Sequence, residues 1–291
     1  MRLTPFAVAA LASAVVLTLS GCVIVVGADG GATPSNGWSN RTVVGDGQYR
    51  TDSRTVSAVE HLDVRGALQV EVRVGAAPSL SVEADGNLLP LVHTEVNAGT
   101  LQVWADGNFR SDKPIRVVLT TPQLTEVRAT GSGRLTVGGL HGAPLRLQLD
   151  GSRKTVLAGA VGRLDIRMQG SGGLDASGLT SAGTSATVIG SGRLGLGQVV
   201  GDELQLEVQG SGGVRAGGVV RKLTVRQTGS GDVDLNQVRS QDAELHTQGS
   251  GDVDVAVAQT LVIDSTGSGS ITVRGDPGQR TVRGRNVTFV Q

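Results

Sequence analysis

A repeat of about twenty residues constrains the fold of this chain more than any other feature. Eight Gly-Ser corners are separated by steps of 20, 19, 20, 20, 19, 20 and 18 residues, and seven of the eight read Gly-Ser-Gly. The first residues of these corners are Gly131, Gly151, Gly170, Gly190, Gly210, Gly229, Gly249 and Gly267. The exception is Gly151, which is followed by Ser152 and Arg153. Such a period is typical of architectures in which each unit packs on its neighbours.

Apolar residues recur at fixed places within each repeat. Four and six residues after the first glycine of each corner, the chain mostly carries Leu, Val, Ile or Ala, with polar or small residues between. A third apolar column lies four residues before the glycine and comprises Leu147, Ile166, Ala186, Leu206, Val225, Leu245 and Ile263. A fourth lies nine residues after it and comprises Leu140, Ala160, Leu179, Val199, Val219, Val238 and Ala258. Alternation with period two predicts short strands.

The repeat and the alternation together predict an all-β fold, a parallel β-helix or β-solenoid with about 20 residues per turn. One such unit cannot bury its own apolar face, but stacked units share a core, with neighbouring strands about 4.8 Å apart. The corner glycines are expected to take positive φ, which only glycine adopts without strain. The register predicts that Leu147, Leu206, Val225 and Leu245 are buried, and that Lys154, Arg193 and Asp232 are exposed.

The N-terminus predicts export and lipidation. Arg2 precedes a short apolar segment, FAVAALASAVVLTL, and Leu19-Ser20-Gly21-Cys22 follows. This arrangement resembles the bacterial lipoprotein signal, in which the cysteine thiol takes a diacylglycerol, and Cys22 is the only cysteine in the chain. An ordinary signal peptide or a membrane anchor are the alternatives, although the apolar segment is short for a membrane span. We expect a signal peptide over residues 1–21 and a lipidated, membrane-attached tether over 22–55; Val23, by the same resemblance, implies the outer membrane.

Residues 56–130 lack the Gly-Ser mark but keep the alternation of strands, which predicts a β-rich N-terminal cap on the solenoid turns of residues 131–275. A tail or cap is expected over 276–291. The order of ADGN at Ala84–Asn87, GTLQV at Gly99–Val103 and IRVVLTTPQLTEVRATGSG at Ile115–Gly133, followed by Gly-Ser-Gly turns, resembles the head GIN domain family. That family is labelled "putative autotransporter adhesin". The resemblance implies a parallel β-helical protein of the bacterial envelope, without catalytic residues to carry over.

Four aspartates form the most specific cluster of the repeat. Asp232, Asp234, Asp252 and Asp254, here called the aspartate quartet, fall three and five residues after their corner glycines. Stacking places equal members about one strand spacing apart, where like charges are unfavourable unless a cation or solvent relieves them. Ca²⁺ binds carboxylate clusters of this kind. The alternative is a solvated acidic face, which we favour, and we expect no metal and no cofactor.

Basic residues occupy the same column in earlier turns, at Arg134, Lys154 and Arg193, with Arg215 beside it. The charge of this side is therefore predicted to change sign along the solenoid, which would suit self-association or binding of an unknown protein or surface ligand. Solubility and protection of sheet edges are the alternative explanation. The whole chain has 26 basic and 26 acidic residues, a balance that gives no electrostatic case for nucleic acid.

Catalysis is not predicted. The histidines, His61, His93, His141 and His246, are scattered, and Phe289 is the only aromatic residue after Gly131. A tripeptide of integrin-binding type, Arg274 to Asp276, fits a turn, and Trp104 and Phe109 are interpreted as packing within the cap. The sequence thus predicts a non-catalytic envelope lipoprotein that presents a rigid solenoid for adhesion, scaffolding or interaction. A polysaccharide-binding or polysaccharide-active solenoid is the alternative.

Overall fold

The computed structural model describes residues 42–290, and Val43–Gln291 form one compact unit. Within the described residues the secondary structure consists of strands and one short 3₁₀ helix, η1 (Leu89–Leu91), so the predicted all-β class is confirmed. None of the described helices could cross a membrane. Cys22, the predicted signal peptide and most of the predicted tether lie outside the described residues.

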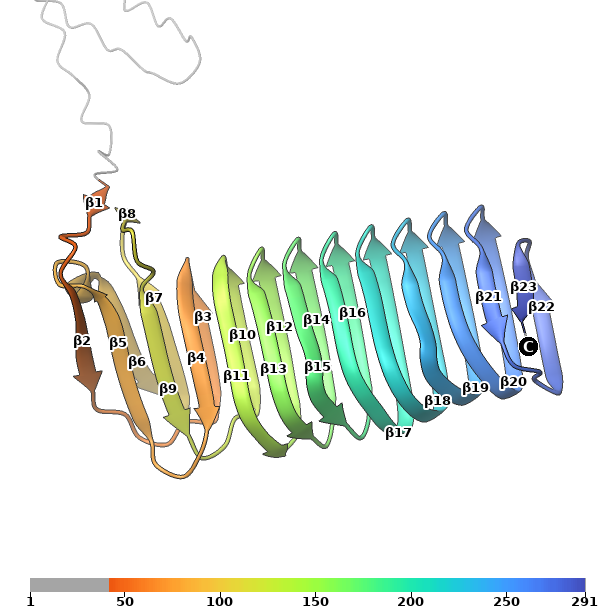
Figure 1. The fold of residues 1–291 in the computed structure, drawn as a ribbon, viewed down its shortest axis with the longest axis horizontal. Coiled ribbons are helices and arrows are strands. Elements are labelled where there is room, and N and C mark those ends of the chain that lie inside the picture. Colours follow the sequence, from red (N-terminus) through yellow and green to blue (C-terminus); the bar gives the residue numbers. More distant parts are fainter. Residues whose placement is uncertain (1–41, 291) are drawn as a thin grey trace, which may run out of the picture. The chain divides into compact units, whose positions relative to one another are not determined.

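The strands stack into two parallel ladders, which we call ladder A and ladder B (Figure 1). Ladder A contains β7 (Thr100–Ala105), β3 (His61–Arg65), β10 (Glu126–Gly131), β12 (Leu145–Gly151), β14 (Leu164–Gly170) and β16 (Thr184–Gly190). Ladder B contains β9 (Arg116–Thr121), β4 (Leu68–Val74), β11 (Gly133–Gly142), β13 (Lys154–Val161) and β15 (Gly173–Ser181). The predicted β-solenoid is therefore confirmed.

Four long strands continue both ladders, because each runs from ladder B into ladder A as one continuous strand. They are β17 (Arg193–Gly210), β18 (Gly213–Gly229), β19 (Val233–Gly249) and β20 (Val253–Gly267). The last strands are β21 (Ile271–Arg274) and β23 (Val287–Val290) in ladder B, and β22 (Gln279–Arg283) in ladder A.

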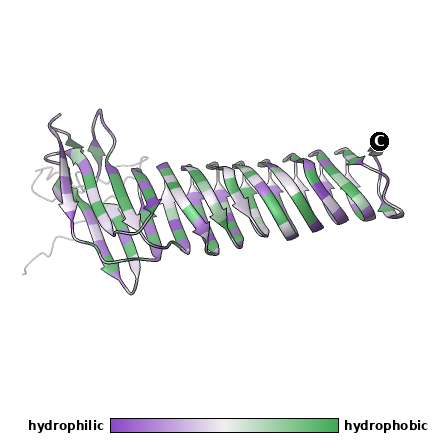
Figure 2. Cartoon of the chain, turned by 60° about the horizontal axis from the view of Figure 1, so that its bottom comes forward, coloured by the Kyte–Doolittle hydropathy of each residue, from purple (hydrophilic) through white to green (hydrophobic). Residues whose placement is uncertain are grey.

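The core lies between the two ladders and is built from the predicted columns. Leu147, Leu206, Val225 and Leu245 are buried, while Lys154, Arg193 and Asp232 are exposed. The alternation is visible as green and purple bands across the strands in Figure 2. Inward and outward positions therefore follow the predicted register over most of each turn.

The column nine residues after the corner glycine departs from the prediction. Leu140, Leu179, Val199 and Val238 are buried, but Val219 is 55% exposed and its neighbour Val220 takes the inward place. Ala160 and Ala258 are exposed in the same way, beside buried Val161 and Val257. Register shifts in ladder B, for example between Arg215 and Gly217, insert or remove a residue before this point. Such bulges exchange inward and outward positions for the residues that follow.

The Gly-Ser corners stack directly on one another. All eight first glycines have positive φ, as predicted, between 104° at Gly131 and 140° at Gly249. The serine amide of a corner donates to the glycine carbonyl of the preceding turn, as from Ser211 N to Gly190 O at 2.9 Å. A Cβ on Gly210 would lie 2.5 Å from that same carbonyl oxygen. Glycine is thus required both by the backbone conformation and by the close approach of successive turns.

The N-terminal cap stacks its turns in an order that differs from their order in the chain. β3 and β4 lie between β7 and β9 on one side and β10 and β11 on the other. Residues 122–125 therefore cross over the segment that leads into β3, and Thr125 N donates to Glu60 O at 2.8 Å. The antiparallel strands β5 (Ser79–Asp85) and β2 (Tyr49–Arg54) extend ladder B, and β6 (Val92–Asn97) extends ladder A. The short strands β1 (Val43–Val44) and β8 (Phe109–Arg110) pair beside them.

Candidate interaction surface

Three cations form a line across the outer side of ladder B. Arg134, Lys154 and Arg193, here called the basic column, lie at or next to the first residues of β11, β13 and β17, and Gly173 occupies the place between the last two. All three are exposed, and within residues 42–290 none of them lies in an ion pair. Like charges on neighbouring strands repel each other. The charges of the basic column are therefore not neutralised by ion pairs among the described residues.

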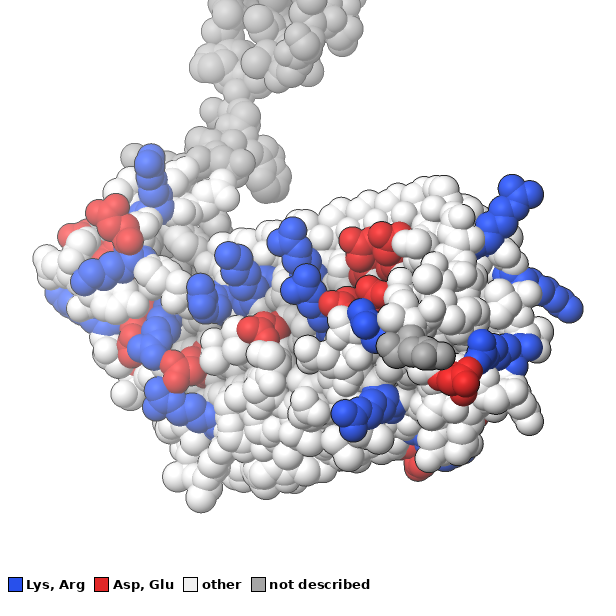
Figure 3. Space-filling model, turned by 45° about the vertical axis from the view of Figure 1, so that its right-hand side comes forward, with Lys and Arg blue, Asp and Glu red and all other residues white. Residues whose placement is uncertain are grey.

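The charge of this side reverses towards the C-terminus, as predicted. Asp234 and Asp254 are register partners in β19 and β20, and Arg215 Nε lies 3.9 Å from Asp234 Oδ2. Figure 3 shows a group of acidic side chains beside a row of basic ones on one face of the unit, whereas both kinds are interspersed over the cap. The solenoid thus carries distinct charged surfaces although the whole chain is neutral.

Two members of the aspartate quartet hold the corners together. Asp232 Oδ1 accepts the Asp252 amide at 3.1 Å, and Asp252 Oδ1 accepts the Ser270 amide at 2.9 Å and its hydroxyl at 2.6 Å. The hydroxyl and then the amide of Ser270 lower the pKa of Asp252. In the described part of the chain, no three His, Cys, Asp or Glu side chains are arranged to hold a metal ion. The carboxylates at the corners act as hydrogen-bond acceptors between successive turns.

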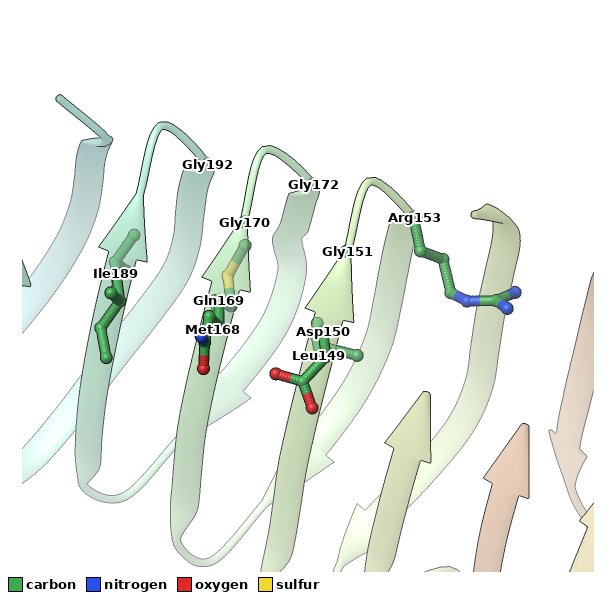
Figure 4. Close-up of a pocket in the computed structure, with 11 residues that line it drawn as sticks. Leu149, Asp150, Gly151, Arg153, Met168, Gln169, Gly170, Gly172, Ile189 and Gly192 are labelled. Atoms are coloured by element: carbon green, nitrogen blue, oxygen red, sulfur yellow. The ribbon is translucent and has the colours of Figure 1, made fainter. Parts of the chain in front are cut away.

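Arg153, the residue that breaks the Gly-Ser-Gly pattern, joins three turns. Its side chain is buried, and its guanidinium donates to Gly66 O at 2.7 Å and to Leu68 O at 2.8 Å. Gly133 is the third residue of the corner that lies between Gly66 and Gly151. Its φ is +97°, whereas the third residues of the later corners do not have positive φ. Figure 4 shows the Arg153 side chain extending away from Gly172 and Gly192, towards the cap. The broken pattern was visible in the sequence, but its partners lie more than eighty residues away.

Burial has an electrostatic effect on Arg153. Desolvation lowers its pKa to about 10, so the guanidinium stays charged at neutral pH. Its Nε has no hydrogen-bond partner among the described residues. The cavity beside it, which Leu149, Met168 and Val188 also line, measures about 10 Å³. That is room for about one water molecule at most, so this cavity is not a ligand site.

The remaining candidates do not converge on a shared centre. Asp276 of the Arg-Gly-Asp tripeptide pairs with Arg280, and His246 pairs with Glu244 at 2.9 Å. Phe109 packs against the core, as interpreted from the sequence. Trp104 does not: it lies on the outer side of β7 and stacks on His93, with ring centroids 5.2 Å apart. Trp104 therefore packs within the cap but outside the core, because Val103 beside it takes the inward position.

Comparison with known proteins agrees with this architecture. The family model described as "Putative auto-transporter adhesin, head GIN domain" matches residues 59–200 and 183–277. No curated protein matches the chain.

Three crystal structures share the fold. A "putative adhesin" from Parabacteroides merdae ATCC 43184 is 18% identical with a TM-score of 0.61, covering 85% of this chain and 98% of its own. A "putative adhesin" from Parabacteroides distasonis ATCC 8503 is 19% identical with a TM-score of 0.60, covering 86% and 100%. A "Putative lipid binding protein" from the same organism is 21% identical with a TM-score of 0.59, covering 86% and 97%. At these identities the structures support the fold.

Proposed function

Because the chain belongs to the head GIN domain family, we propose that it is a non-catalytic, adhesin-like protein of the cell envelope, and that its basic column binds an anionic surface ligand. The family description and two of the similar structures name adhesins, which supports this class of function. We choose an anionic partner because the side chains of the basic column lie in register and form no ion pair among the described residues.

The spacing of the basic column suits an extended ligand with repeated negative charges. Arg134 and Lys154 are direct register partners, about 4.8 Å apart, and Arg193 follows about two strand spacings further. The ladder fixes the backbone spacing of the three residues before binding, so only their side chains must be ordered when a partner arrives. An acidic polysaccharide has charges along a line and matches this geometry.

Attachment to the membrane is the second part of the proposal. The Leu19-Ser20-Gly21-Cys22 motif supports lipidation at Cys22, and Val23 supports the outer membrane by the sorting rule that the resemblance implies. A lipid anchor at one end would leave the solenoid free to meet ligands at or near the cell surface.

Retention on immobilised acidic polysaccharide tests the role of the basic column. The variant with Arg134→Gln, Lys154→Gln and Arg193→Gln should lose retention at low salt, and the parent should elute as salt rises, because exposed charges are screened. A matched control removes three other exposed cations from ladder A, Arg146→Gln, Arg167→Gln and Arg226→Gln, and should stay bound. Equal loss in both variants, or equal retention on a neutral polysaccharide, would contradict the proposal. Light scattering on the same samples separates ligand binding from self-association.

A further inference from the structure

A hollow of about 270 Å³ opens on the outer surface of the cap, where the row of corners begins. It is lined by Arg65, Gly66, Gln102, Trp104 and Ala105. Elsewhere each corner glycine is covered by the preceding turn: a Cβ on Gly131 would lie 2.9 Å from Gly66 O. Gly66 has nothing within 4 Å of its Cβ position, because the chain leaves ladder A after β7 and turns to β8. The topology of the cap therefore creates the hollow.

Trp104 forms a fixed aromatic wall of this hollow. Its ring stacks on His93 at an interplanar angle of 20°, and His93 Nε2 lies 2.8 Å from Asp106 Oδ2. His93 stacks on one face of the indole, and Asp106 in turn fixes His93. Trp104 is not part of the buried core, so its position is not explained by packing of the solenoid interior. An outward tryptophan beside a hollow offers an apolar surface for a flat ligand.

Polar groups surround the aromatic wall. Arg65 Nη2 donates to Asp63 Oδ2 at 2.7 Å and keeps further N–H groups, and Gln102 supplies both a donor and an acceptor. The charges of Arg65 and Asp63 offset each other, so the site favours a neutral ligand over an ion. Its volume lies just below the range of about 300–1,000 Å³ for sites of drug-sized molecules. One ring with an apolar face and several hydroxyl groups fits these properties.

We propose that Trp104, Arg65 and Gln102 bind a single neutral pyranose ring, with the C–H face of the sugar on the indole and its hydroxyls on the two polar side chains. This site lies in the cap and is independent of the basic column, so either can fail without the other. It would add recognition of a specific sugar to a protein that meets a carbohydrate-bearing surface.

Ligand-observed NMR with methyl glycosides of glucose, galactose and mannose, and with N-acetylglucosamine, tests the site on the folded chain. At least one neutral sugar should bind saturably, and Trp104→Ala should weaken its binding about tenfold or more. Arg65→Gln should weaken it less. The matched control is Phe289→Ala, which removes a different exposed aromatic ring, one that lies against Arg280, and should bind as the parent does.

A second measurement keeps the test independent of folding defects in the alanine variant. In a Trp38→Phe background, Trp104 is the only tryptophan, so its fluorescence should change with sugar concentration. The variant that lacks the basic column should give the same titration as the parent. The proposal is overturned if none of these sugars binds, if binding survives Trp104→Ala, or if only glucuronate and galacturonate bind.

Discussion

Four glycine-to-alanine substitutions separate the two reasons for glycine at the corners. Gly210 combines φ +115 with a Cβ position 2.5 Å from Gly190 O. Gly212 has no positive φ but would place Cβ 2.6 Å from Gly192 O. Gly142 has φ +91 with nothing within 4 Å, and Gly138 has neither feature. The set therefore tests strain alone, close approach alone, both together, and neither.

The expected losses follow from these geometries. A non-glycine residue at strained positive φ costs about 1–3 kcal/mol, and overpacking costs about 1–3 kcal/mol. Alanine gains about 0.4–1 kcal/mol through the unfolded chain. Gly142→Ala and Gly212→Ala should thus lower the free energy of unfolding by about 1–2 kcal/mol each, and Gly210→Ala by about 2–5 kcal/mol. Gly138→Ala should be neutral or slightly stabilising.

The close approach at Gly210 has little freedom to relax. The atom that the new Cβ would meet is the backbone carbonyl oxygen of Gly190. This oxygen also accepts a hydrogen bond from the Ser211 amide at 2.9 Å, so moving it would weaken a hydrogen bond between turns. Urea denaturation followed by circular dichroism measures the four free energies. Because repeat proteins can unfold in parts, the slope of each transition must be compared with that of the parent. The reasoning is refuted if Gly210→Ala costs no more than either single-feature variant, or if Gly138→Ala is equally damaging.

Four further predictions follow from the register, the anchor and the charges. Leu206→Ala should cost about 2–5 kcal/mol and Arg193→Ala less than about 0.5 kcal/mol in the same urea assay; similar losses would contradict the register. Cys22→Ser should move the chain from the membrane fraction to the soluble fraction, and unchanged partitioning would count against lipidation. Millimolar Ca²⁺ should not change the Tm of the parent or of a variant in which all four residues of the aspartate quartet are replaced by Asn. A rise in Tm seen only in the parent would establish a metal site. The pKa of Asp252 is lowered in the folded chain, so its ionised carboxylate adds to the free energy of unfolding at neutral pH. This stabilisation is lost as the pH falls through and below the usual carboxyl range. Asp252→Asn should therefore make the free energy of unfolding decline less steeply between pH 5 and about 2.

Local periodicity was sufficient to predict the turns, because it is repeated many times. The burial of Leu206 and the exposure of Arg193 both follow from alternation alone. The outward position of Trp104 could have been found in the same way from its neighbour Val103. The bulges before Val219 could not, because the small residues Gly217 and Gly218 are compatible with either register.

Contacts between residues far apart in the chain could not be predicted from the repeat pattern. The position of the β3–β4 turn between two later turns leaves no mark in the sequence, because its strands alternate like any others. The partners of Arg153 are backbone carbonyls, which carry no sequence signal. The hollow beside Trp104 depends on where the chain leaves ladder A, and hence on the same unpredicted order of turns.

The stacked corners also bear on how such a chain can change in length. Removing residues 191–210 would join Gly190 directly to Ser211, restore a Gly-Ser-Gly corner, and bring β18 beside the partners that β17 now has. The rod would shorten by one strand spacing, about 4.8 Å. The same excision of residues 132–151 would remove the turn that lies between Arg153 and the cap. Arg153 could then not keep its present hydrogen bonds to Gly66 O and Leu68 O. Natural relatives should therefore gain and lose whole turns on the C-terminal side of Arg153, and keep a constant number between Arg153 and the cap.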